Sequence, residues 1–388
     1  MRVMKSVQQH YTPNSEVLWL LEQFRVMLNE CIHIGLQENV TSLKSLSLKA
    51  YKALARYGIM SCYKLGAISA ATGILRNHRK AKRKNPKTKE PYAKRLQLKT
   101  CYGSTENGNF KIENDAILLP IKPHHPIPIP LNQHTLEVLS GPNLEIRAVT
   151  LTEETLSITY MREVEPIQPH GLVALDRNLD NVTLADSSGQ VIRHDLSEAT
   201  RIKAQCRETK HHMKRNDAHV RRRVFGKYGR IQRNKVQQIL HHASKQIVEQ
   251  AKRNQHGIVM ENIKNIRRLY RKGNWQGKKY RGTMNSWSFA ELQRQIEYKA
   301  RWEGLLVIYV PPYGTSSRCS ICGSRMKPEE NRTLRCPSCG YVVDRDVNAA
   351  KNILARGLRF SPVAPQIEAM VSVLTPPVDC GESSPMGK

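Results

Sequence analysis

Four cysteines near the end of the chain constrain its fold more than any other feature. Cys319 and Cys322 form one Cys-x-x-Cys pair, Cys336 and Cys339 form a second, and 13 residues separate the pairs. A glycine follows each pair directly and lets the backbone turn tightly around the thiolates. Two such knuckles converge on one tetrahedral Zn²⁺, so the spacing predicts a closed structural zinc site whose four ligands are all protein thiolates.

The second cysteine pair runs into two aspartates and then a helix. Asp344 is interpreted as the N-cap of the helix that continues through "VNAAKNILARG". Asp346 opens that helix, and it is one of three carboxylates at the ends of expected elements. The other two are Asp176, after "GLVAL", and Glu261, after "GIVM".

The expected order of strands and helices brings these three acids together. The strands "GLVALD", "NVTLAD" and "VIRHD" precede a basic helical region at 197–254, the strand that ends at Glu261, the helix "SWSFAELQRQIEYKARWEG" and the strand "LLVIYV". This order predicts a mixed α/β sheet of the RNase H type, with Asp176 and Glu261 at adjacent strand ends and Asp346 packed against them. Clustered carboxylates repel one another unless hard cations lie between them, so the pattern favours a two-Mg²⁺ site for phosphodiester hydrolysis.

The N-terminal part of the chain has a different character. Apolar residues at three- and four-residue steps in 14–75 predict two to four helices. From about 95 to 168, short alternating runs such as "AILLPI", "TLEVL" and "LSITYM" predict a small β unit, to which "MRVMKSVQQHY" adds a first strand. Residues 361–388 contain five prolines and no clear period, which predicts a disordered tail.

The positive charge is concentrated in two segments. Of the formal net charge of +29, residues 201–281 carry 24 Lys and Arg against four acids, and residues 76–99 carry 11 against one. Charge of this density repels itself unless a polyanion binds, which favours nucleic acid over a membrane surface as the partner. No run approaches the roughly 20 apolar residues of a membrane helix, and the first residues lack the apolar core of a signal peptide. We therefore expect a protein of the cytoplasm or nucleoid.

The C-terminal half resembles the TnpB family, RNA-guided nucleases encoded by bacterial and archaeal insertion sequences and related to type V CRISPR effectors and Fanzor proteins. The matching segments are "VALDRNLDNVTLAD", "VMENIKNI", "SFAELQRQIEYKA", "TSSRCSICG" and "RCPSCGYVVDRDVNAAKNI". The resemblance implies an RNA-guided DNA endonuclease that cuts target DNA beside a short motif. It implies a split RuvC-like domain with Asp176, Glu261 and Asp346 as catalytic ligands of Mg²⁺, and a zinc ribbon inserted before the last of them. Its partners would be a guide RNA from the element end and target DNA, with no membrane.

The resemblance also implies a division into domains. The expected parts are a wedge-like β domain (1–13 and 91–169), a helical recognition lobe (14–90), a RuvC-like nuclease domain (170–312 and 341–358), a zinc ribbon (313–340) and a disordered tail (359–388). The N-terminal parts match the family in order and character, not in motifs.

Some readings stay open on the sequence alone. Asn178 stands where the family usually has glycine, and asparagine tolerates left-handed backbone angles better than most residues. Trp275, in "RKGNWQGKKYRG", is expected either to stack on a base or to anchor a basic loop by burial. Two other functions compete with the nuclease: an RNA-guided repressor that binds DNA without cutting it, and a transposase that joins DNA strands.

Overall fold

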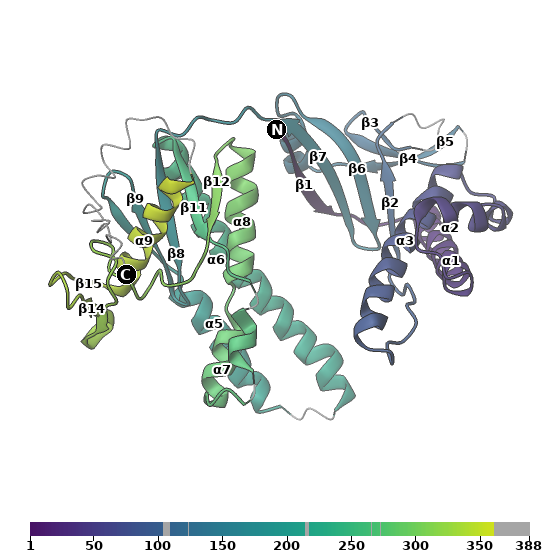
Figure 1. The fold of residues 1–388 in the computed structure, drawn as a ribbon. Helices are drawn as coiled ribbons and strands as arrows, with labels where there is room; N and C mark the ends of the chain where they lie inside the picture. The colour runs from purple at the N-terminus through teal and green to yellow at the C-terminus, as the bar shows by residue number, and fades with distance from the viewer. Residues whose placement is uncertain (104–108, 123, 214–216, 265, 272, 361–388) are drawn as a thin grey trace, which may run out of the picture. The chain divides into compact units, whose positions relative to one another are not determined.

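The chain forms two compact units in a computed structural model that describes residues 1–360 except 104–108, 123, 214–216, 265 and 272 (Figure 1). One unit comprises Arg2–Glu163, and the other comprises Met1 and the described residues from Val164 onward. Both contain helices and sheets, so the predicted multidomain α/β fold is confirmed. The predicted tail at 361–388 lies outside the described residues.

The first unit begins with a strand and a group of helices. Asn14 caps the first helix, because its side chain accepts a hydrogen bond from the Val17 amide at 2.9 Å. The packing is close, since a Cβ atom on Gly35 would overlap a methyl group of Leu75. The helices are α1 (Ser15–Gln37), α2 (Leu43–Ala50), the 3₁₀ turn η1 (Ala53–Tyr57) and α3 (Ser61–Lys84).

Two antiparallel sheets complete this unit. The first has the order β1-β7-β6-β2, so the N-terminal residues pair with the last strand of the unit. The second has the order β3-β4-β5. The strands are β1 (Arg2–His10), β2 (Gln97–Cys101), β3 (Lys111–Glu113), β4 (Ala116–Lys122), β5 (His125–Pro130), β6 (Glu145–Thr152) and β7 (Thr155–Glu163).

One predicted strand of this unit is wrong. The run "TLEVL" forms part of the helix α4 (Gln133–Leu139). The side chain of Asn132 accepts a hydrogen bond from the Thr135 amide at 2.8 Å and so caps the helix. A capping residue immediately before the run therefore outweighs the β propensity of Thr and Val.

The second unit is built on a five-stranded mixed sheet of order β10-β9-β8-β11-β12 (Figure 1). β8 and β12 both run parallel to β11, while β9 and β10 are antiparallel additions at the other edge. The strands are β8 (Gly171–Arg177), β9 (Asn181–Asp186), β10 (Val191–Asp195), β11 (His256–Glu261) and β12 (Val307–Val310).

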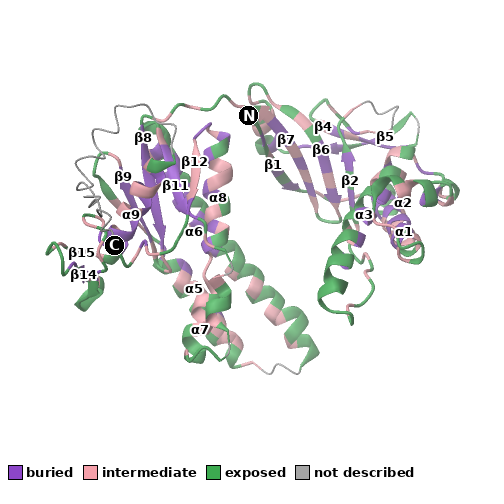
Figure 2. Ribbon diagram, in the orientation of Figure 1, coloured by how far each residue is buried: buried purple, intermediate pink, exposed green. Residues whose placement is uncertain are grey.

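Helices cover both faces of this sheet, and Figure 2 shows its central strands buried. On one face, Ile353 and Leu354 of α9 (Arg345–Arg359) pack against Leu172, Ala174 and Val259. The helices of the other face pack against a separate cluster that includes Val173 and Leu175. They are α5 (Ser197–His211), α6 (Phe225–Arg253) and α8 (Phe289–Trp302). Because side chains alternate along a strand, Asp176 and Glu261 belong to the α9 face.

A small three-stranded sheet lies between β12 and α9 in the chain. It consists of β13 (Lys327–Pro328), β14 (Thr333–Arg335) and β15 (Val342–Asp344), so it extends past the expected boundary at residue 340. The remaining elements of the unit are η3 (Val220–Val224), η4 (Ile266–Tyr270), α7 (Lys278–Ser286) and η5 (Glu330–Arg332). Among the described residues, no helix has the length and apolar character needed to cross a bilayer.

Candidate functional site

The first two acids stand side by side at the carboxyl ends of parallel strands. β8 and β11 pair from Gly171 with His256 to Leu175 with Met260. One further step in this register places Asp176 beside Glu261. Both residues are buried, at 6% and 8% exposure, although Glu261 is the last residue of its strand and Asp176 the last but one. A buried carboxylate at a strand end is unusual and marks this edge of the sheet as a candidate site.

The third acid reaches the same edge from α9. Asp346 lies in the first turn of that helix and is 2% exposed. Asp344 is the N-cap, as predicted, because its Oδ1 accepts hydrogen bonds from the amides of Asp346 at 2.8 Å and Val347 at 3.1 Å. Asp344 also pairs with Arg193 of β10 at 2.9 Å. The cap and this ion pair fix the start of α9, so that Asp346 is buried and Asp344 is not.

The charges of Glu261 and Asp346 act on Asp176. The pKa of Asp176 is raised to about 7, chiefly by burial and to a smaller extent by the nearby charges of Glu261 and Asp346. Burial also raises the pKa of Glu261. Ionising such a buried acid without a counter-charge costs free energy. A bound cation would therefore stabilise the charged forms of Asp176 and Glu261.

Polar neighbours hold the carboxylates in place, and sequence reasoning missed most of them. The Asn178 amide donates to Asp176 Oδ2 at 2.8 Å, and the Thr315 hydroxyl donates to Glu261 Oε1 at 2.6 Å. The Arg177 guanidinium is almost fully buried and donates to the Glu261 carbonyl oxygen at 2.6 Å. These contacts orient the two acids before any ligand binds.

Asn178 serves the site in a different way from the one expected. It is not among the described residues with positive φ, so the turn after β8 does not need a left-handed residue there. What asparagine adds at this position is a side-chain amide that reaches Asp176. The replacement of glycine therefore supplies a hydrogen-bond donor to the first acid.

An arginine of η5, the turn between β13 and β14, forms an ion pair with the third acid. Arg332 donates to Asp346 Oδ1, and its own side chain is 55% exposed whereas that of Asp346 is 3% exposed. Its backbone φ is +64°, in the left-handed region that non-glycine residues rarely adopt. No sequence pattern singles out this arginine, because the contact depends on how the small sheet folds back onto α9.

The four cysteines form the second candidate site. Their Sγ atoms all lie within 4.8 Å of one another, and the Cys319–Cys339 and Cys322–Cys336 separations are 3.7 and 3.4 Å. Tetrahedral Zn–S bonds of about 2.3 Å would place the sulfurs about 3.8 Å apart. The glycines after the two pairs have φ of +76° and +72°, as tight knuckles require. The thiols are therefore already arranged as a four-coordinate metal site.

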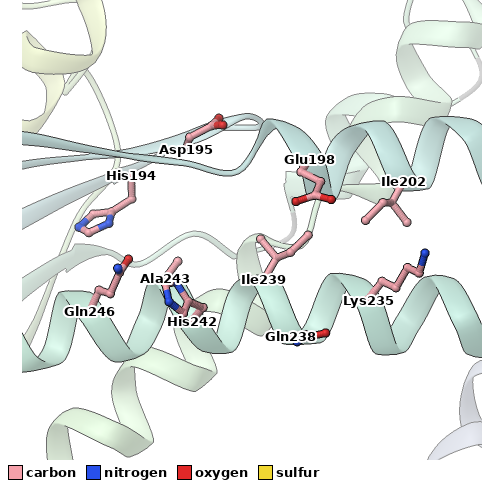
Figure 3. A pocket seen from close by; sticks show the side chains of 10 residues that line it. All are labelled: His194, Asp195, Glu198, Ile202, Lys235, Gln238, Ile239, His242, Ala243 and Gln246. Carbon is pink, nitrogen blue, oxygen red and sulfur yellow. The ribbon is translucent and has the colours of Figure 1, made fainter.

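A groove on the other side of the sheet does not compete with these sites. It has a volume of about 530 Å³ and is lined by side chains of β10, α5 and α6, among them His194, Glu198 and His242 (Figure 3). Asp195 points away from His194 in this view. Among the described residues, the potential metal ligands that form a tight cluster are the four cysteines, and none of the side chains of this groove belongs to that cluster. The groove is therefore a mixed polar surface between helices.

Comparison with known proteins places the chain in a family. The model of the Cas12f1-like TNB domain matches residues 289–353, which run from α8 into α9. The TnpB-like protein MJ0751 of Methanocaldococcus jannaschii is 32% identical over 260 residues, which span 64% of this chain and 92% of that protein. The chain belongs to the TnpB family.

Two further relatives of this TnpB-family chain match shorter parts, and one solved structure aligns over most of it. InsQ of Escherichia coli, whose name marks it as a candidate RNA-guided DNA endonuclease, is 49% identical over 71 residues, or 17% of each chain. The CRISPR-associated endodeoxyribonuclease Cas12f1 of Sulfoacidibacillus thermotolerans is 34% identical over 116 residues, or 29% of this chain and 25% of that protein. A Cas12f1 solved with its guide RNA and target DNA aligns over 91% of this chain and 99% of that one, with 16% identity and a TM-score of 0.35.

Proposed function

We propose that this TnpB-family chain is an RNA-guided DNA endonuclease of an insertion sequence, which cuts target DNA beside a short motif. One observation carries the proposal: Asp176 and Glu261 are buried at neighbouring strand ends, and the charge of the buried Asp346 acts on Asp176. Membership of the family and relatives named as RNA-guided or CRISPR-associated DNA endonucleases support it. The chain would act in the prokaryotic cytoplasm, at the nucleoid.

The domain roles follow from this proposal. The mixed sheet with α5, α6, α8 and α9 is taken as an RNase H-like nuclease domain of the RuvC type, and the small sheet with its cysteines as a zinc ribbon inserted in it. Residues 1–13 with 91–169 are taken as the wedge, and residues 14–90 as the recognition lobe. The order of elements supports these roles.

The residues of the acidic site fit magnesium. Their donors are carboxylate oxygens, which hard cations prefer, and burial makes their ionised form dependent on a counter-charge. Asp176, Glu261 and Asp346 would hold the ions, while Asn178 and Thr315 keep two of the carboxylates oriented. Bound magnesium would supply activation of a water and stabilisation of the leaving oxygen of a phosphodiester. Arg332, displaced from Asp346, would remain near the site as a free cation for a DNA phosphate.

The four thiols fit zinc in a structural role. They offer four soft ligands at tetrahedral spacing and leave no position open for a substrate. Cys319, Cys322, Cys336 and Cys339 would hold the metal and thereby fix the ribbon from which Arg332 extends.

The basic segments suit a guide RNA and its duplex with target DNA. Residues 201–281 and 76–99 hold the whole of the positive net charge, since the rest of the chain is close to neutral, and they would contact backbones without reading bases. Specificity for a long site would then come from pairing with the RNA. A positive surface without a guide would bind any duplex.

Two rival functions make different predictions. A repressor has no use for a complete set of buried acids, so the acids speak against it. A transposase could use the same acids, but it would leave joined strands where a nuclease leaves breaks, and gel analysis of products separates the two.

The deciding experiment rewrites the guide. Protein freed of RNA should cut no duplex efficiently, and its native RNA should restore cutting beside one short motif. Replacing the terminal guide segment should move the cut to the newly complementary DNA. Protein that cuts the same place whatever RNA is supplied would overturn the proposal.

A further inference from the structure

An exposed tryptophan stands on a basic arm next to the acidic site. The arm is formed by the described residues of 262–286, that is, all but 265 and 272; the sequence of this segment contains eight Lys and Arg and no acid. Trp275 has a relative exposure of 102%, so the alternative of a buried anchor is wrong. Its φ is +54°, in the left-handed region, which costs a bulky side chain roughly 1 to 2 kcal/mol. Neither the exposed side chain of Trp275 nor its left-handed backbone stabilises the fold.

The arm around Trp275 is held by specific contacts. The Asn274 side chain donates to the carbonyl oxygens of Leu269 at 3.0 Å and Arg268 at 3.3 Å, which closes the loop before the tryptophan. The rings of Tyr270 and Tyr280 meet edge to face with centroids 5.9 Å apart. These contacts order the loop that carries the exposed Trp275 indole.

The arm is also fastened to the nuclease unit. Arg207 of α5 donates to the Gly282 carbonyl oxygen at 3.0 Å and to the Thr283 hydroxyl at 3.1 Å, which joins α5 to α7 (Figure 1). At the end of α7, the Trp287 indole donates to the Asn178 carbonyl oxygen at 2.8 Å. Asn178 is the residue whose side chain donates to Asp176. The arm thus begins directly after Glu261, and the residue that follows it contacts Asn178, just after the strand that carries Asp176.

A flat aromatic ring set among cations is the combination that binds single-stranded nucleic acid. Bases stack on the ring whatever their sequence, while the cations follow the phosphates. Duplex bases are already stacked on one another, so the indole has a free partner only where a strand is unpaired. Both ends of the arm join the acidic site, where DNA is the proposed substrate.

We propose that Trp275 stacks on an unpaired base of the DNA strand that is delivered to the three acids. This inference rests on the proposed function, because it assigns the strand by the chemistry of the neighbouring site. Trp275 is a positioning residue, since it would hold the strand and not touch the scissile phosphate.

The test measures binding of single-stranded DNA to the RNA-loaded protein without magnesium, so that no cutting occurs. The probe is a 12-nucleotide oligothymidine that does not pair with the guide, with an abasic version as its partner. Trp275→Ala should weaken binding of the oligothymidine about 5- to 100-fold, as expected for the loss of one stacked base. Trp275→Phe should restore most of the affinity. Trp19→Ala, which removes a partly exposed tryptophan of the other unit, should leave it unchanged.

A second readout isolates stacking from charge. A 2-aminopurine placed in the oligonucleotide should be quenched by the wild-type protein and not by Trp275→Ala, while the abasic probe should bind both proteins equally. The proposal is overturned if Trp275→Ala binds the oligothymidine as well as wild type. It is also overturned if the variant loses affinity for the guide RNA instead. Binding is measured without cleavage. A failure of RNA-guided cutting would therefore contradict the proposed function, while the effect of Trp275→Ala on oligothymidine binding would still test the stacking proposal.

Discussion

The two candidate metal sites of the second unit are assembled in opposite ways. The four thiols come from one short segment, 319–339, and they already lie within 4.8 Å of one another. The three acids come from β8, β11 and α9, and each is engaged by a protein donor: Asn178, Thr315 or Arg332. One site depends on local turns, and the other depends on the whole sheet being folded with α9 on it.

This difference teaches what each site is for. A closed set of soft ligands is complete without a substrate, so it stabilises structure. Buried acids with raised pKa values are costly to keep ionised until a cation arrives, and such cost is common at functional sites. Removing the thiols should therefore lower stability first, while removing the acids should stop chemistry first.

The largest effect is expected from the two strand-end acids. Asp176→Asn and Glu261→Gln should each abolish detectable cleavage while leaving guide and target binding nearly intact, because metal ligands act together in the chemical step. Single-turnover cleavage and gel-shift assays measure the two properties. Asp180→Asn, in the exposed turn after β8, is the matched control and should cut like wild type. Equal loss of binding and cleavage would argue that these acids support the fold.

The thiols should show the reverse order of effects. Cys336→Ser should remove zinc and lower the melting temperature, because a structural site contributes its binding free energy to folding. Zinc content by mass spectrometry and thermal unfolding check this. Withholding magnesium from the wild-type protein should stop cleavage and leave both quantities almost unchanged. Folded, active wild type with no zinc would contradict the assignment.

The hydrogen bond from Thr315 should matter less than the acid it orients. Thr315→Val keeps the shape and removes the hydroxyl that donates to Glu261 at 2.6 Å. Loss of such an orienting contact costs about 10- to 100-fold in metal affinity or activity. The magnesium concentration for half-maximal cleavage should rise accordingly. Thr159→Val, in strand β7 of the other unit, should leave it where it was.

The smallest effect is expected where α9 approaches the sheet. A Cβ atom on Gly357 would lie 2.5 Å from a methyl group of Val259 on β11, the strand that ends at Glu261. Gly357→Ala should lower the free energy of unfolding by about 1 to 3 kcal/mol through overpacking. Gly226→Ala in α6 is the matched control, because its Cβ would meet nothing within 4 Å and should stabilise the helix slightly. Chemical denaturation measures the free energy of unfolding of both variants. Metal analysis should find the wild-type zinc content in both.

The two sites also differ in how far the sequence could predict them. The thiol cluster follows from spacing alone, since two knuckles and their glycines are local features. The meeting of Asp176 with Glu261 required the strand order as well, and the pairing of β8 with β11 bears out that order. Asp344 was separable from Asp346 because a cap has its own position at the start of a helix.

The contacts around the acids could not be predicted in the same way. Thr315 and Arg332 reach the acids from the chain between β12 and α9, and such long-range contacts leave no period or spacing in the sequence. The sequence suggests a role for the backbone of Asn178, whereas the structure shows that its side chain contacts Asp176. The misassigned run in α4 shows the same limit on a smaller scale, because one capping asparagine decided between strand and helix.

The most direct test of the account compares two aspartates that stand two residues apart. RNA-loaded Asp346→Asn and Asp344→Asn proteins would be assayed for single-turnover cleavage of one target duplex, with target binding measured in parallel. If Asp346 completes a metal site with Asp176 and Glu261, its variant binds the target and does not cut it. Asp344→Asn keeps a capping side chain and should cut within a few-fold of wild type. Wild-type cleavage by Asp346→Asn, together with an inactive Asp344→Asn, would contradict the central claim that these three buried acids form the cutting site.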